Sequence, residues 1–224
     1  MRGLILVAVF WTVSTKRLTP DGGVRVRSLQ THDLHVCNAV QIENGIFLTP
    51  AACLNARDLQ DLEVIGKELK THCNVTKVQS HPKYLFLSYN IAVLQVECDR
   101  SVGKAQTASF SDSKPGDRLT LAGVNRSLRV KTQACSVCQK EYAVFDCKRQ
   151  ICLKVAGKVA QTVAEGLAGA GIFTQNAKLV ALLSYGFANG SLVAERVIYY
   201  KQFLHRTMQE FTSSKSNGPT CLQF

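Results

Sequence analysis

The chain has 224 residues, 46% of them hydrophobic and 19% charged, a balance typical of globular proteins that excludes wholesale disorder. This length suffices for one large domain or two small ones. The formal net charge of +11 predicts attraction to anionic glycans, anionic lipid or acidic proteins, with a merely solubilising surface as the alternative. Because the cations are scattered along the chain, we expect no nucleic-acid partner.

The first residues are typical of a secretory signal peptide. A basic start at Met1–Gly3 precedes a predominantly apolar run from Leu4 to Val13, and the small residues Ser14 and Thr15 follow. The run is shorter than the ~20 residues of a membrane-spanning helix, and no later stretch approaches that length. We therefore expect a signal peptide over residues 1–15 and a secreted, extracellular protein; a buried N-terminal strand is the alternative.

Short strands follow at intervals of roughly ten residues, which favours a barrel or a sandwich. Single strand patterns occur at residues 24–29 and 118–124. Two further regions each contain a pair of short apolar segments separated by a turn: 37–49 around Glu43–Gly45, and 169–184 around Gln175–Ala177. Apolar residues at helical spacing from Val197 to Phe211 predict one amphipathic helix that packs on the strands.

A further hairpin is centred near Leu85. Symmetric pairing about this centre gives four expected partners: Val75 with Val96, Lys77 with Leu94, His81 with Asn90, and Cys73 with Cys98. Directly opposed cysteines on neighbouring strands lie within reach of a disulfide, so we expect a Cys73–Cys98 bridge.

Three separated segments resemble the signature segments of trypsin-like serine proteases. They are Cys37 with Phe47–Cys53, His81–Tyr84 with Asn90–Leu94, and Gly166–Phe173. The resemblance implies an all-β fold of two six-stranded antiparallel Greek-key barrels with a C-terminal helix. It also implies a domain over residues 24–211, between a short N-terminal segment (16–23) and a flexible tail (212–224), and it matches Ser184–Gly186 to the family's substrate-wall strand.

The resemblance also places residues that cannot perform the family's chemistry at its catalytic positions. Ala52 stands in the position of the histidine, Asn90 in that of the aspartate and Ala168 in that of the serine. A triad needs a nucleophilic hydroxyl, an imidazole to accept its proton and a carboxylate to orient the imidazole. We therefore expect no enzyme activity; a residual hydrolase with relocated chemistry is the least favoured alternative.

Neighbouring positions of the family's site are altered too. Thr162 occupies the position at the base of the specificity pocket, which is acidic in trypsin-type members. Gly166 keeps a glycine of the oxyanion turn. Leu167 replaces the aspartate that pairs with the new N-terminus after activation, so we expect no activation of the usual kind.

Nine cysteines favour an oxidising compartment. The resemblance implies the bridges Cys37–Cys53 and Cys138–Cys152. Cys135 and Cys147 are a local candidate pair, which leaves Cys221 for a disulfide-linked partner or a free thiol. The four cysteines from 135 to 152 also have the spacing of a zinc knuckle, but the predicted secretion favours disulfides, so we expect no metal and no cofactor.

Three sequons, at Asn74, Asn125 and Asn189, are glycosylation candidates. Together these features predict a secreted, non-catalytic serine protease homologue that acts as a binding or regulatory protein: a cofactor, decoy or ligand. Its expected partner is another protein, such as an active protease, an inhibitor or a receptor. The alternative is a basic effector that binds glycosaminoglycans or membrane surfaces.

Overall fold

The computed structural model describes residues 26–55, 57–66, 71–98, 107–124, 126–156, 166–186 and 190–213. Several expectations fall outside these residues: the signal peptide 1–15, the segment 16–23, the tail from 214 onward, Thr162, Asn125, Asn189 and Cys221. Within the described part of the chain, no helix is both long and apolar enough to cross a membrane.

Six antiparallel strands close the first barrel in the order β1-β2-β3-β6-β5-β4. The strands are β1 (Val26–Thr31), β2 (Leu34–Glu43), β3 (Ile46–Thr49), β4 (Leu62–Gly66), β5 (Thr71–Ser80) and β6 (Ala92–Cys98). Two single-turn 3-10 helices, η1 (Ala51–Leu54) and η2 (Leu59–Asp61), lie between β3 and β4. The predicted turn between β2 and β3 is present, with Gly45 at a φ of +73°.

The second barrel repeats this order, with β7-β8-β9-β12-β11-β10 closed into a ring. Its strands are β7 (Arg118–Ala122), β8 (Ser127–Thr132), β9 (Gln150–Val155), β10 (Gly171–Phe173), β11 (Leu179–Gly186) and β12 (Leu192–Arg196). Helix α1 (Cys135–Glu141) joins β8 to β9, and the chain finishes with η3 (Val197–Tyr200) and α2 (Lys201–Ser213). The predicted pair of six-stranded barrels with a C-terminal helix is therefore confirmed.

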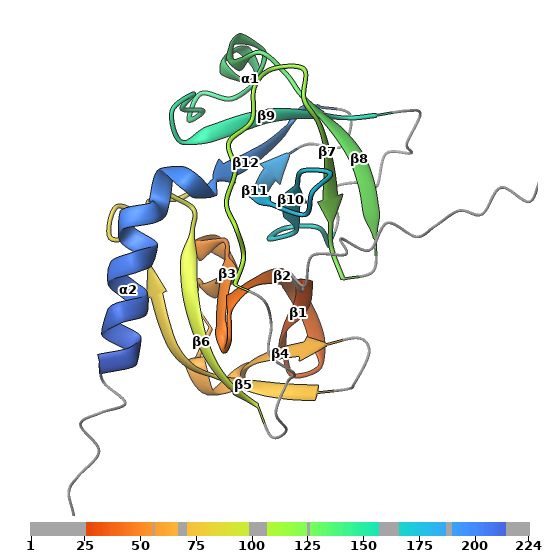
Figure 1. The fold of residues 1–224 in the computed structure, drawn as a ribbon. Helices are drawn as coiled ribbons and strands as arrows, with labels where there is room; N and C mark the ends of the chain where they lie inside the picture. Colours follow the sequence, from red (N-terminus) through yellow and green to blue (C-terminus); the bar gives the residue numbers. More distant parts are fainter. Residues whose placement is uncertain are drawn as a thin grey trace, which may run out of the picture.

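The two barrels share a hydrophobic core. Figure 1 shows β7–β12 above β1–β6, with α2 alongside β5 and β6. One buried cluster includes Leu48 of the first barrel, Leu182 of the second and Leu204 of α2, while a separate cluster fills each barrel. The apolar stripe of α2 accordingly packs on the body of the protein, as its helical spacing predicted.

The predicted β5–β6 register is only partly correct. Cys73 lies opposite Cys98 and Val75 opposite Val96, as predicted, but Lys77 pairs with Gln95. A β-bulge between Val75 and Lys77 adds one residue to β5 and shifts every later pair. The predicted partners Lys77–Leu94 and His81–Asn90 are thus wrong by one position, and the backbone N–H of His81 donates to the Ile91 carbonyl instead.

Candidate functional site

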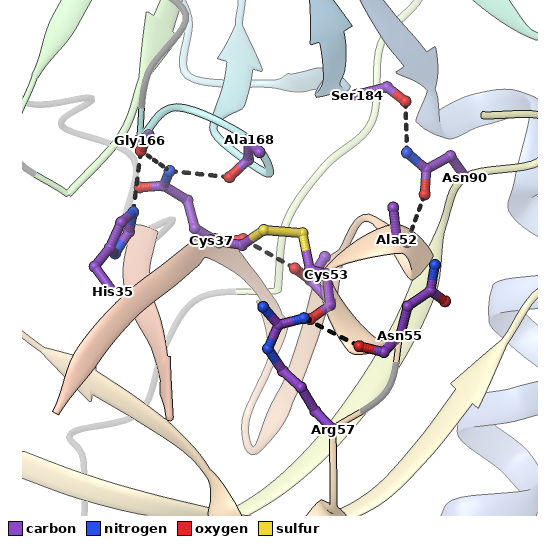
Figure 2. Close-up of a disulfide and its surroundings, with 12 residues drawn as sticks. His35, Cys37, Ala52, Cys53, Asn55, Arg57, Asn90, Gly166, Ala168 and Ser184 are labelled. Carbon is purple, nitrogen blue, oxygen red and sulfur yellow. Dashed lines mark hydrogen bonds between the residues drawn. A yellow bond between two sulfur atoms is a disulfide. The ribbon is translucent and has the colours of Figure 1, made fainter. Parts of the chain in front are cut away.

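The three predicted triad positions gather where the two barrels meet (Figure 2). Ala52 lies in η1, directly after β3, and Asn90 precedes β6. Ala168 lies in the turn before β10 of the second barrel and packs against the buried cluster of the first. The disulfide Cys37–Cys53, with its Cα atoms 6.2 Å apart, fastens η1 to β2 and so fixes the backbone that carries Ala52.

Asn90 forms the first bridge across this seam. Its side chain is fully buried, and its Oδ1 accepts a hydrogen bond from the backbone N–H of Ala52, 2.8 Å away. Its Nδ2 donates to the Oγ of Ser184 on β11, also at 2.8 Å. The Asn90 amide is therefore hydrogen-bonded through both its oxygen and its nitrogen, with one partner in each barrel.

Asn38 of β2 forms a second bridge, which the sequence did not point out. Its backbone N–H donates to the Ala168 carbonyl at 2.7 Å, and its Nδ2 donates to the carbonyls of Gly166 (2.9 Å) and Ala168 (3.0 Å). Its Oδ1 accepts from the backbone N–H of Val124 at 2.9 Å. One buried amide thus fixes the whole turn that carries the Ala168 methyl group.

His35 holds the same turn from outside. Its Nε2 lies 3.0 Å from the Gly166 carbonyl oxygen, and its Nδ1 lies 2.7 Å from the Oγ of Ser28. Because a carbonyl can only accept, Nε2 carries a proton and donates to Gly166; in the neutral imidazole, Nδ1 then accepts a hydrogen bond from the Ser28 hydroxyl. Gln30 in turn donates to the Ser28 oxygen at 3.0 Å. These bonds stabilise Gly166 at a φ of +70°.

Gly169 lies at the closest approach of the two barrels. Its φ is +79°, and a Cβ built on it would come within 2.0 Å of the Asn38 carbonyl oxygen and 2.9 Å of the Cδ of Pro50. Neither the conformation nor the space admits a side chain. The first barrel can therefore contact the Ala168 turn only because position 169 is a glycine.

Leu167 points into the second barrel instead of toward a charge. It is 3% exposed and packs with Leu121, Ile172 and Leu183 in the cluster that fills that barrel. Its Cδ2 would lie 2.8 Å from a Cβ placed on Gly123. The side chain at this position is therefore a packing anchor in an apolar environment.

Leu192 closes the wall formed by the end of β11. It pairs with Gly186 across β11 and β12, and a Cβ on Gly186 would meet its Cδ2 at 2.6 Å. The Leu192 side chain, 2% exposed, thus lies across Gly186 and belongs to the core of the second barrel. A leucine in an apolar strand looks like any core residue, so the sequence carried no signal for this role.

A buried carboxyl group lies behind Asn90. Glu195 of β12 is fully buried; its Oε1 accepts from the Nε2 of Gln150 at 2.7 Å, and its Oε2 accepts from the Tyr200 hydroxyl. Burial raises the pKa of Glu195, and hydrogen bonds from Tyr200, Gln150 and the Asn90 backbone, together with the charge of Arg149, offset part of that rise. The pKa of Tyr185 is also raised, to about 12, first by burial and then by Glu195.

The comparisons with known proteins agree with this architecture. The family model of trypsin matches residues 19–204. The chain belongs to the trypsin family. No curated protein is significantly similar to it in sequence.

Solved structures of the same fold are similar in shape but distant in sequence. Kallikrein-related peptidase 10 in complex with Zn2+ superimposes with a TM-score of 0.71 at 18% identity, covering 85% of this chain and 98% of that one. The scabies mite inactivated protease paralogue S-I1 gives 0.69 at 15%, covering 83% and 93%. The structure named GrC gives 0.70 at 18%, covering 85% and 96%. At such identities the likeness supports the fold alone.

The side chains at the seam of this trypsin-family protein offer little chemistry. Ala52 and Ala168 present methyl groups, and the Asn90 amide is hydrogen-bonded at both ends. Among the hydrogen bonds of the described residues, one contact joins a hydroxyl to an imidazole, that of Ser28 with His35. Ser28 is 4% exposed, and its oxygen already accepts from Gln30.

Four disulfides join the cysteine pairs expected from the sequence: Cys37–Cys53, Cys73–Cys98, Cys135–Cys147 and Cys138–Cys152. Two of these bridges are formed by the four cysteines from 135 to 152, whose spacing also fits a zinc knuckle. Within the described ranges, no group of three or more histidine, cysteine or acidic side chains is arranged to hold a metal ion. The sequon residue Asn74 lies exposed on β5.

Proposed function

We propose that this member of the trypsin family is a secreted, non-catalytic binding or regulatory protein. The observation that carries the proposal is the composition of the seam where Ala52, Asn90 and Ala168 meet. The resemblance assigns them to the triad positions, and all three lie beside the contact of the two barrels. None of them supplies a nucleophile, a proton acceptor or an anionic orienting group.

The missing groups matter because a triad acts as a unit. Removal of one member of a serine protease triad costs several orders of magnitude in rate, and removal of all three costs about as much as removal of the nucleophile alone. A peptide bound at this seam would meet methyl groups, so no acyl intermediate forms on Ala168. Leu192 lies across Gly186, at the end of the strand that the resemblance assigns to the substrate wall.

Secretion is supported by the cysteines and by the chain's start. The four disulfides use eight cysteines, and disulfides in this number persist in oxidising compartments outside the cytosol. The apolar run Leu4–Val13 has the length of a signal-peptide core. A stable pair of barrels that presents loops can bind a partner without an active site, because function resides in sites and not in the fold.

The test is covalent labelling of the purified, secreted protein with a fluorophosphonate probe, run beside active trypsin and beside a Ser28→Ala variant. We expect no labelling and no turnover of a mixed peptide-reporter library. Labelling that disappears in Ser28→Ala would show that the buried Ser28–His35 pair acts as a relocated catalytic dyad, and it would overturn the proposal. Turnover that persists in Ser28→Ala and is lost on heating would overturn it equally.

A further inference from the structure

A row of cations crosses three neighbouring strands on the outer face of the second barrel. The strand register sets Arg118 of β7 directly opposite Lys131 of β8, and Lys131 opposite Lys154 of β9. Arg129 lies two residues before Lys131 and so shares its face. All four side chains are exposed, while the alternating residue Val130 is buried in the barrel. We call these four residues the basic ladder.

The ladder is unfavourable for the isolated protein. Like charges directly opposite one another on adjacent strands repel and destabilise the sheet. The ion pairs found in the described ranges use His32, His72, Arg149 and Arg196 as their cations, and none uses a ladder residue. The carboxylate of Asp117, the residue before Arg118, accepts a hydrogen bond from the backbone N–H of Lys114.

The ladder also borders a hollow. An open hollow of about 470 Å³ lies between β8, β9, α1 and the turn before β7, and Lys131 and Lys154 both line it. Val137 and Val155 contribute apolar surface to it. Its size falls within the ~300–1,000 Å³ of ordinary ligand sites. A concave surface with an apolar floor and cations on its wall suits a chain of sugar rings, which carry apolar C–H faces and pendant anions.

We propose that the basic ladder and its hollow form a binding site for a sulfated polysaccharide. Neighbouring strands lie ~4.8 Å apart, so the three aligned cations span about 10 Å and match a ligand with repeated negative charge better than one small anion. The site lies on β7, β8 and β9 with their adjoining turn and helix, and it uses none of the residues of the Ala52–Asn90–Ala168 seam. Whether this site binds a polysaccharide therefore does not depend on the proposed loss of catalysis.

Other polyanions fit this face less well. No aromatic side chain is among the described residues that line the hollow, so these residues offer none of the stacking platforms that single-stranded nucleic acids use. The large hydrophobic residues that the described chain exposes, such as Phe86 and Tyr199, lie outside β7, β8 and β9, so this face offers no apolar anchor to a bilayer. The predicted secretion also places the protein where sulfated glycans are abundant polyanions.

The experiment compares two triple variants of the full secreted protein on immobilised heparin over a series of salt concentrations. One removes the ladder (Arg118→Gln, Lys131→Gln, Lys154→Gln). The matched control removes three exposed cations elsewhere (Lys178→Gln, Lys201→Gln, Arg206→Gln), so both lose one arginine, two lysines and the same net charge. We expect the ladder variant to lose about tenfold or more in affinity and to show a shallower dependence on log salt, with the control close to the parent.

Two further measurements make the result decisive. Heparin should raise the Tm of the parent and the control but not that of the ladder variant, whose own Tm should equal or exceed the parent's because the opposed charges are gone. Hyaluronan, which has carboxylates but no sulfates, should bind at least about tenfold more weakly than heparin. If both triple variants lost the same affinity for heparin, net charge alone would explain the effect, and the proposal would be overturned. Tighter, ladder-dependent binding to duplex DNA, to an acidic protein or to phosphatidylserine vesicles would overturn it too.

Discussion

The side-chain amide of Asn90 donates to the hydroxyl of Ser184, 2.8 Å away, and this bond ties the first barrel to the second through a site that is fully buried on the Asn90 side. The other end of the amide accepts from the backbone N–H of Ala52. Asn90, which the resemblance assigns to the triad's aspartate position, thus acts as a structural bracket between the two barrels. Its role can be tested by stability measurements that need no substrate.

Asn90→Ala removes both hydrogen bonds, which leaves the half-buried backbone N–H of Ala52 and the buried hydroxyl of Ser184 without these partners. An unsatisfied buried polar group costs about 1–3 kcal/mol, so we expect the free energy of unfolding to fall by about 2–4 kcal/mol. The measurement is urea unfolding followed by fluorescence. Asn55→Ala is the control, because Asn55 is exposed and bonds to the Tyr84 hydroxyl; it should cost less than about 1 kcal/mol. Equal losses in both variants would contradict the bracket role.

Gly169→Ala should destabilise the protein severely. The new Cβ would overlap the Asn38 carbonyl oxygen at 2.0 Å, and the residue would have to keep a φ of +79°. Left-handed strain alone costs about 1–3 kcal/mol, and the clash adds to it, so we expect little folded protein or a Tm lowered by about 10 °C or more. Gly116→Ala is the matched control: it also has a positive φ, but a Cβ there meets nothing within 4 Å. If the two variants have the same Tm, the close approach at Gly169 is not what limits stability.

Leu167→Asp introduces the aspartate that the resemblance to trypsin-like proteases implies at this position, but not a cationic partner for it. The carboxylate would enter the apolar cluster that fills the second barrel, where Leu167 is 3% exposed. An uncompensated buried charge costs about 3–5 kcal/mol, so we expect a loss of that size at neutral pH. The loss of stability should be smaller in acid, because burial of a protonated, neutral carboxyl group costs less free energy. Circular dichroism melts at two pH values measure both effects. A stability that is unchanged at neutral pH would mean that a cationic group reaches this position.

The buried Glu195 should make stability depend on pH. Burial raises its pKa above the ordinary value of 4.5, so the folded state keeps this proton to a higher pH than the unfolded chain does. The contribution of Glu195 to stability is therefore fully present below pH 4.5 and declines as pH rises through the folded pKa, by at most about 1.4 kcal/mol per pH unit.

The test is Glu195→Gln, which keeps an acceptor for Gln150 and removes the titration. The free energy of unfolding, measured with urea from about pH 5 to about pH 8, should decline less with pH in this variant than in the parent. The exposed Glu210→Gln is the control and should follow the parent curve. A parent curve that rises over this range in parallel with the Glu195→Gln curve would contradict the assignment.

Strand patterns and turns in the sequence predicted an all-β protein with one terminal helix, whereas the pair of six-stranded barrels was expected from the resemblance to trypsin-like proteases. The turn at Gly45, the Cys73–Cys98 pairing and the C-terminal helix all follow from local chemistry. The β5–β6 register failed after Val75, since a bulge adds one residue without any mark in a run of strand-forming residues. Helix α1 was missed because it has only seven residues, too few for a helical period to emerge.

The site was harder to predict from the sequence than the fold. Ala52, Asn90 and Ala168 could be placed through short segments around them, but the residues that hold them could not. Asn38 and His35 act on a turn about 130 residues away in the chain, so no spacing reveals the contact. Such long-range hydrogen bonds depend on how two finished barrels dock, and that information is not local.

The four disulfides have a consequence for how the molecule can come apart. Each bridge spans 12 to 25 residues, and each lies inside a single barrel. Across the described residues the barrels are thus held to one another by non-covalent contacts, such as those of Asn90 and Asn38, and by the one segment of chain that leads from β6 to β7. A single proteolytic nick in that segment would yield two internally crosslinked fragments that separate in denaturant without any reductant.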